Sequence, residues 1–294
     1  MNTSEILKKI KKIEITTKNL VNDMFSGEYH SLFKGQGLEF SEVREYQIGD
    51  SFNQIDWNVT ARMRYPFIKK FEETRELNVI LLIDNSASTI FGTKQYLKSE
   101  YITEVAAVLS FSALSNNDKV GLLLFTDEIE KYIPPRKGRK NALRILRDIL
   151  YFKPKKKKTD IKQAIEYIHR LQKKRSIIFI ISDFVDSNYL NDLKLLASRH
   201  DVIAIRILDK AELELPKAGL IDFQDLETGE TITVNTNNKK LRKKFKAEIN
   251  KQNAKIEEQF KKNKIDLVSL ETDQSYVKEL MKFFKLRIKR KNQI

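Results

Sequence analysis

The chain has 294 residues, of which 41% are hydrophobic, and this suits one large α/β domain with additions or at most two domains. It has no cysteine, so disulfides, thiol nucleophiles and cysteine-ligated metal sites are excluded. Only His30, His169 and His200 are present, so a histidine-rich zinc site is not expected. The net charge of +15 predicts a general attraction to acidic partners.

Residues 4–25 carry apolar side chains at roughly helical spacing, with lysines between them. Such a basic amphipathic helix either docks on its own protein or lies on a membrane surface, and we favour docking. Peripheral contact with a membrane stays open as the alternative. Lysines interrupt every apolar run near the amino terminus, and no apolar stretch reaches the ~18 residues that span a membrane. We therefore expect a cytoplasmic protein without a transmembrane segment.

The next segment, residues 26–76, is broken by glycines and crowded with aromatic and charged residues, which predicts an irregular, loop-rich structure. We therefore divide the chain into residues 1–76, a helix and this segment, and residues 77–294, the main domain. Four charged residues of the segment suggest an ion-pair network: Arg44, Asp50, Asp56 and Arg62. We favour a structural network that pins the segment to the main domain, with Trp57 as its apolar anchor, over a functional charged site.

From residue 78 onward, short apolar stretches alternate with amphipathic ones. Strands are predicted at 78–83, 120–125, 177–181, 202–208 and 265–270. Helices are predicted at 97–114, 138–151, 160–172, 189–199, 238–263 and 275–288. Because wholly apolar strands joined by helices form parallel sheets buried on both faces, the sequence predicts a doubly wound, mostly parallel α/β fold. Residues 219–234 interrupt this pattern, and Gly229 between two short apolar runs predicts an inserted β-hairpin.

Polar residues gather where predicted strands end. The first strand leads into Asp84, Ser86 and Ser88, the strand at 177–181 leads into Asp183, and Thr159 opens the helix between them. In a doubly wound sheet these loops meet at one edge. Two carboxylates and three hydroxyls are hard oxygen donors, which suit Mg²⁺ or Mn²⁺. Each aspartate alone is typical of a residue that caps a strand-end turn, but the five together favour a metal.

The five residues Asp84, Ser86, Ser88, Thr159 and Asp183 resemble, in this order, the metal-ion-dependent adhesion site of von Willebrand factor A domains. The resemblance covers residues 78–286. It implies that the first Asp, both Ser and the Thr bind the metal directly or through water, and that the last Asp acts through water. One departure is Lys158, which stands where that family usually has glycine.

The upstream segment resembles the signature of bacterial domain-of-unknown-function family 58. Its motifs are Gly35-Gln36-Gly37-Leu38-Glu39-Phe40, Val43-Arg44-Glu45-Tyr46-Gln47-Ile48-Gly49-Asp50, Ile55-Asp56-Trp57-Asn58 and Ala61-Arg62. Members of that family carry an A-type domain and are often encoded beside MoxR-type AAA+ ATPases. The resemblance implies a protein partner in assembly or chaperone-like work, with an acidic residue of the partner completing the metal site.

The sequence thus predicts a protein that binds partners through a metal and is not an enzyme. A Mg²⁺- or Mn²⁺-dependent hydrolase at the same residues is one alternative, although no general base stands out and Ser86 and Ser88 lack a nucleophile motif. The second alternative is binding of nucleic acid or an anionic surface by the lysine-rich stretches. Basic patches without ordered aromatics are typical of solvated faces, so we do not expect nucleic-acid binding.

Overall fold

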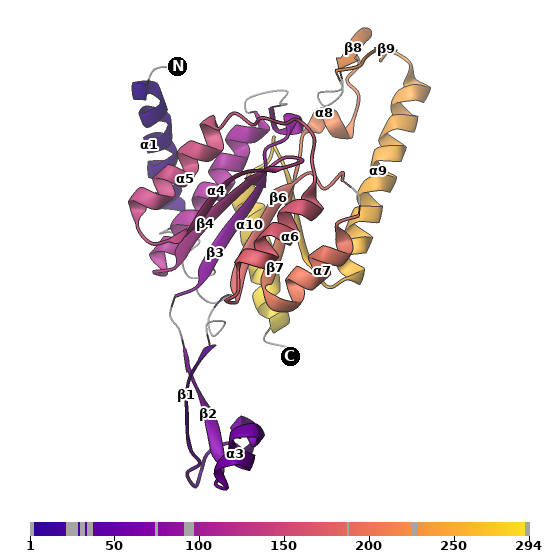
Figure 1. Ribbon diagram of the computed structural model, residues 1–294. Helices are drawn as coiled ribbons and strands as arrows, with labels where there is room; N and C mark the ends of the chain where they lie inside the picture. Colours follow the sequence, from indigo (N-terminus) through magenta and orange to yellow (C-terminus); the bar gives the residue numbers. More distant parts are fainter. Residues whose placement is uncertain are drawn as a thin grey trace.

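The computed structural model describes residues 3–21, 29, 33, 38–73, 76–90, 97–186, 188–224 and 229–291. A six-stranded sheet forms its centre (Figure 1). The strands are β3 (Asn78–Asp84), β4 (Lys119–Phe125), β5 (Ile129–Arg136), β6 (Ser176–Ser182), β7 (Asp201–Leu208) and β10 (Asp266–Glu271). They lie in the order β10-β7-β6-β3-β4-β5, and every neighbouring pair is parallel except β4 and β5. The predicted doubly wound, mostly parallel sheet is confirmed.

The sheet is buried on both faces because side chains along each strand point alternately to its two sides. In β3, Val79, Leu81 and Ile83 join one core, and Ile80 and Leu82 join the other. The first core is covered by α1 (Thr3–Leu20), α4 (Lys98–Ser115), α5 (Arg139–Tyr151) and α10 (Tyr276–Lys291). The second is covered by α6 (Ile161–Leu171), α7 (Leu190–Arg199) and α9 (Lys239–Lys262).

The amino-terminal helix α1 docks on the protein itself, as we favoured. Ile10 and Ile13 are buried, and Arg139 of α5 pairs with the nearly buried carboxylate of Glu14. This contact uses the apolar face that a membrane would otherwise take. Among the described residues, every helix is too short or too polar to cross a bilayer.

Smaller elements complete the main domain. The predicted hairpin is formed by β8 (Leu220–Gln224) and β9 (Thr231–Asn235), which pair antiparallel. Gly229 adopts a positive φ of 79° before β9, as a turn there requires. Two short helices not predicted from the sequence follow β3 and β7: η3 (Ala87–Ile90) and α8 (Lys210–Leu213).

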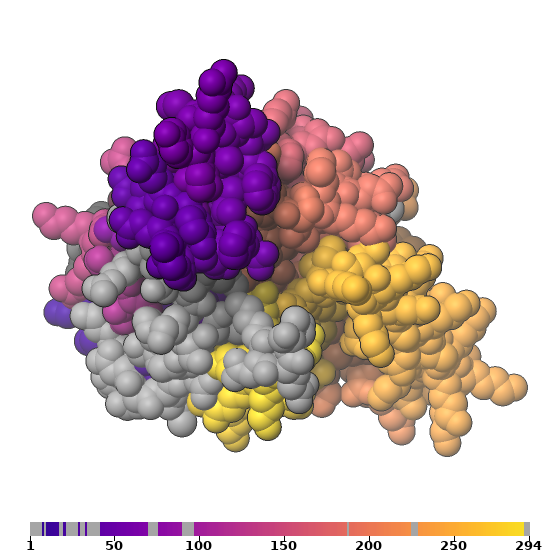
Figure 2. All heavy atoms as spheres, turned by 90° about the horizontal axis from the view of Figure 1, so that it is seen from below, coloured from indigo at the N-terminus to yellow at the C-terminus, as the bar shows by residue number. Residues whose placement is uncertain are grey.

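Residues 38–73 form a projecting arm in place of the irregular loops that the sequence predicted. Its strands β1 (Leu38–Glu45) and β2 (Phe67–Glu73) pair antiparallel, and η2 (Phe52–Gln54) and α3 (Trp57–Met63) lie at its far end. Figure 1 shows the arm extending away from the sheet, and Figure 2, seen from below, shows it standing out from the main domain. The Gly35-Gln36-Gly37 motif lies outside the described residues.

The proposed pinning of this segment to the main domain is wrong. Trp57, the expected anchor, is 68% exposed. Arg44 pairs with Asp50 at 2.8 Å and Asp56 with Lys69 at 3.4 Å, so these ion pairs lie within the arm. Among the described residues, Arg62 has no ion-pair partner. The charged residues therefore shape the arm, and Phe52, Trp57 and Tyr65 are left in solvent.

Candidate functional site

The topology places two of the predicted site residues at the point where the strand order reverses. Numbered in chain order within the sheet, the strands run 3-2-1-4-5-6, and the reversal falls between β3 and β6. Ligands of such sheets bind outside the carboxyl ends of the strands at this point. Asp84 is the last residue of β3, and Asp183 directly follows β6. We call Asp84, Ser86, Ser88, Thr159 and Asp183 the crest site.

Asp84 lies at the centre of the crest site. Its Oδ1 accepts a hydrogen bond of 3.0 Å from the backbone N–H of Ser86. Its Oδ2 accepts one of 2.7 Å from the hydroxyl of Ser182, the last residue of β6. These two bonds therefore hold the carboxylate between β3 and β6, the adjacent strands at which the strand order reverses.

The predicted hydroxyl residues lie beside Asp84 on two loops. Ser86 and Ser88 share a hydrogen bond of 3.0 Å between their Oγ atoms, and Thr159 Oγ1 lies 3.4 Å from Asp84 Oδ2. The backbone N–H of Ala87 donates to the carbonyl of Lys157 at 3.0 Å, which ties the loop before α6 to the loop after β3. Ser86, Ser88, Thr159 and Asp84 thus converge as predicted.

The side chain of Asp183 makes different contacts from those of the other four residues. Its Oδ1 accepts from the backbone N–H of Val185 at 3.2 Å, and its side chain is only half-buried. Direct hydrogen bonds from Asp183 to the other crest residues are absent from the described part of the chain. Its negative charge nevertheless acts on Asp84. This position agrees with a carboxylate that reaches a cation through water.

The crest site concentrates negative charge in a buried place. Asp84 is 1% exposed, and its burial, together with the nearby charge of Asp183, raises its pKa to about 6. Within the described residues, lysine and arginine side chains make no ion pair with Asp84. A buried carboxylate without a counter-ion is costly unless a cation joins it. Together with the surrounding hydroxyls, this donor set fits a hard divalent cation.

The sequence reading missed Ser182 and Arg206. Ser182 makes the shortest hydrogen bond to Asp84, and its place at the end of the strand beside β3 was the signal that could have found it. Arg206 of β7 donates from Nε to the backbone carbonyl of Asp183 at 2.8 Å. An arginine within a strand of otherwise apolar residues was its signal. Lys158, the departure from the adhesion-site pattern, is exposed.

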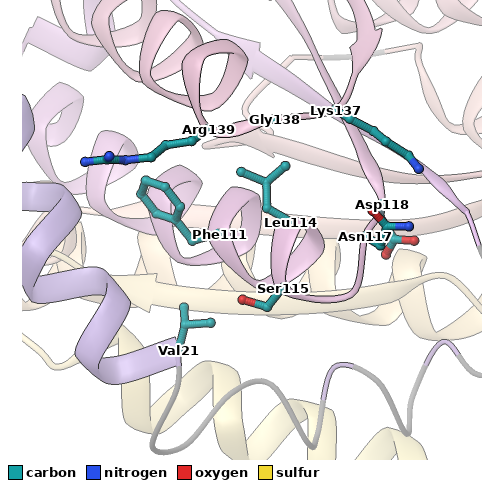
Figure 3. Close-up of a pocket in the computed structure, with 9 residues that line it drawn as sticks. All are labelled: Val21, Phe111, Leu114, Ser115, Asn117, Asp118, Lys137, Gly138 and Arg139. Atoms are coloured by element: carbon teal, nitrogen blue, oxygen red, sulfur yellow. The ribbon is translucent and has the colours of Figure 1, made fainter.

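A separate cavity of about 460 Å³ lies at the opposite end of the sheet, and Phe111 and Leu114 are among the residues that line it (Figure 3). Its charged groups already have partners, because Arg139 binds Glu14 and Lys137 binds Glu76. Asp118 accepts from the backbone N–H of Leu77 at 2.9 Å. These contacts stabilise the packing of the main domain and make the cavity a weaker candidate than the crest site.

The fold and the crest site together define a doubly wound domain of the von Willebrand factor A-like type. The chain belongs to the family described as Protein of unknown function DUF58, whose model matches residues 42–255. An uncharacterized protein of Mycobacterium bovis is 30% identical over 277 residues, which cover 93% of this chain and 87% of that protein. The uncharacterized protein YeaD of Bacillus subtilis is 31% identical over 109 residues, 37% of this chain and 25% of YeaD.

Two solved structures are similar at low sequence identity. The conserved hypothetical protein BatB from Bacteroides thetaiotaomicron has a TM-score of 0.47 at 20% identity, over 72% of this chain and 99% of that one. The SpRpn10 VWA domain has a TM-score of 0.36 at 14% identity, over 69% of this chain and 93% of that one.

Proposed function

We propose that this protein is a metal-dependent interaction module, in which a Mg²⁺ or Mn²⁺ ion at the crest site binds a carboxylate of a protein partner. Asp84, Ser86, Ser88 and Thr159 would hold the ion, and Asp183 would act through water. A bound ion would supply a positive centre with an open position for a carboxylate.

The observation that carries this proposal is the buried carboxylate of Asp84, which has hydroxyl neighbours and no basic partner among the described residues. A structural aspartate at the end of a strand would need only its backbone contact. Here two hydroxyls from two further segments of the chain, those of Thr159 and Ser182, lie at its carboxylate as well. Such a set of uncharged oxygen donors leaves the negative charge available for a cation.

The choice of partner rests on the family resemblance of the segment from Gly35 to Arg62. It suggests a MoxR-type AAA+ ATPase, for which this protein would be an accessory in assembly or chaperone-like work. The ATPase would offer an Asp or Glu side chain to the ion. The basic character of the chain, with a net charge of +15, favours approach of an acidic surface.

The test is the affinity of the full chain for a MoxR-type ATPase from the same organism, measured in EDTA and again after Mg²⁺ is restored. We expect affinity to fall at least about tenfold in EDTA, which corresponds to about 1.4 kcal/mol. Since EDTA also affects the ATPase, the deciding comparison is Asp84→Ala in Mg²⁺. This variant should bind as weakly as the wild type does in EDTA.

The matched control is Asp222→Ala. Asp222 is an exposed aspartate on β8, outside the crest site, so its removal changes the net charge equally. The Asp222→Ala variant should bind the ATPase as tightly as the wild type does. Equal affinity of the Asp84→Ala and Asp222→Ala variants would reject the metal mechanism.

A further inference from the structure

Beside the crest site, Arg206 is a buried cation that makes no ion pair with the residues the structure describes. It is 3% exposed, and its Nε donates a hydrogen bond to the carbonyl of Asp183. Its Nη1 is buried and donates to no acceptor in the described part of the chain. Buried guanidinium groups stay charged, and their donors are normally satisfied. An arginine that keeps donors unused is therefore a candidate for binding an anion.

Arg206 lines a pocket of about 770 Å³, which we call the α7–α9 pocket. Its walls come from the loop after β6, the start of α7 and one side of α9. Phe184 and Tyr189, both buried, form its apolar side, and Ile256 faces it from α9. The pocket shares the loop from Asp183 to Asp186 with the crest site, so the two sites are adjacent.

The charges around the pocket select the kind of anion. Three basic side chains (Lys162, Arg206 and Lys255) and two acidic ones (Asp186 and Asp192) line it. The two aspartates in the lining disfavour a doubly charged phosphate, so an anion with a single negative charge is favoured. The planar fork of a guanidinium matches a carboxylate. The apolar wall suits the methylene groups that carry a Glu carboxylate.

We infer that the α7–α9 pocket binds a side-chain carboxylate of an acidic protein segment, held by Arg206. In the setting of the proposed function, on which this last step rests, the segment belongs to the partner whose other carboxylate reaches the crest site. One loop, residues 183–186, then contacts both carboxylates. The pocket makes recognition depend on a pair of acidic residues rather than on one.

The experiment uses the ¹⁵N-labelled full chain in EDTA, so that no metal contributes. The probe is N-acetyl-glutamate methylamide, and the uncharged analogue is N-acetyl-glutamine methylamide. Backbone amide signals of Val185, Asn188 and Tyr189 report on the pocket. We expect saturable shifts with the glutamate probe and none with the glutamine analogue at matched ionic strength.

Variants show whether Arg206 is responsible. Arg206→Met replaces the cation with an apolar side chain of similar length and should abolish the shifts. Arg206→Lys keeps the charge without the fork and should weaken binding at least several-fold, and it serves as the test if the methionine variant does not fold. Arg170→Met, an exposed arginine of α6 outside the pocket, should leave the shifts unchanged.

Three results would overturn the inference: equal shifts with both probes, shifts that persist in Arg206→Met, or tighter binding of inorganic phosphate than of the glutamate probe. The proposed function fails separately, because it predicts an effect of Asp84→Ala on partner binding and this titration contains no metal. In Mg²⁺, Arg206→Met should also lower the affinity for the partner at least several-fold. An unchanged affinity there would show that the partner does not use the pocket.

Discussion

The main domain and the arm use polar and apolar residues in opposite ways. In the main domain, apolar strands form the structure, and polar residues such as Asp84 are left at the crest with hydrogen-bonding capacity to spare. In the arm, Asp50 and Asp56 hold the structure through their hydrogen bonds, and Phe52 and Trp57 are exposed. The arm therefore leaves aromatic residues in solvent, whereas the main domain buries a carboxylate, Asp84, at the end of its central strand.

The two regions also lie at opposite ends of one strand. The arm joins the main domain before Asn78, where β3 begins, and the crest site begins at Asp84, where β3 ends (Figure 1). Seven residues of strand separate them by about 20 Å. We therefore expect changes in one region to leave the other intact, and the following predictions test this independence.

The largest effect is expected in the main domain from Gly121→Ala. A Cβ at this position of β4 would lie 2.9 Å from the carbonyl oxygen of Ile133 and 2.9 Å from the nitrogen of Pro135. Because both atoms belong to the backbone of β5, the edge of the sheet must shift, at a cost of about 3 kcal/mol in the free energy of unfolding. Unfolding in urea measures this change in the free energy of unfolding. A change below about 0.5 kcal/mol would show that β5 is not packed as described.

A change of the opposite sign is expected from Asp84→Asn in EDTA. The folded-state pKa of Asp84 is raised to about 6, so the ionised form destabilises the fold above that pH. Asparagine keeps an acceptor for Ser182 and removes the charge. We expect the free energy of unfolding at neutral pH to rise by about 1–2 kcal/mol. A loss of similar size would mean that the charge stabilises the metal-free protein.

The same raised pKa predicts how Mg²⁺ binding depends on pH. Protons compete with the ion for Asp84, so its affinity should fall as the pH drops through about 6, by up to about tenfold per pH unit. In the absence of metal, stability should instead fall as the pH rises from the unfolded-state pKa towards 6. Calorimetric titration with Mg²⁺ at several pH values measures the first effect. An affinity that does not change with pH would exclude Asp84 as a ligand.

A smaller and local effect is expected in the arm from Asp56→Ala. Asp56 caps α3 by accepting from the backbone N–H groups of Asn58 and Val59, and it pairs with Lys69. Losing the cap costs about 1 kcal/mol. Amide hydrogen exchange should become faster in α3 and β2, while β3 and β6 keep their protection. Faster exchange across the sheet would show that the arm and main domain unfold as one unit.

The smallest effect is expected from Trp57→Ala. Because the side chain is 68% exposed, the free energy of unfolding should change by less than about 0.5 kcal/mol. Trp57 is the single tryptophan of the chain, so the emission of the wild type reports on the arm alone. Emission typical of solvated indole is expected. Emission typical of a buried ring would contradict the exposed arm.

The sequence predicted strands correctly where nearly all side chains of the strand are buried. Four of the five predicted strands of the sheet, β3, β4, β6 and β7, are almost wholly apolar. The strand β5 was missed because it is a half-exposed edge strand that contains Pro134 and Pro135. The strand β1 was missed because a shift of register between Phe40 and Glu42 breaks the alternation.

The candidate site, like the fold, could be predicted in part from the sequence. Asp84, Ser86, Ser88 and Thr159 follow from strand ends and from the family motif, and the structure brings them together. Ser182 and Arg206 stand out in the sequence as a polar strand end and a strand arginine, but their partners depend on which strands become neighbours. The order of strands is a property of the whole sheet, and no single segment of the sequence determines it.

The most direct test of the crest site is paramagnetic broadening of amide signals by Mn²⁺ added to the ¹⁵N-labelled full chain. We expect broadening to begin at the amides of Asn85 to Ser88, Thr159 and Asp183, and Mg²⁺ to reverse it. The amides of the arm, including Trp57, should stay sharp. Broadening that begins elsewhere, or that is unchanged in Asp84→Ala, would contradict a metal at the crest site.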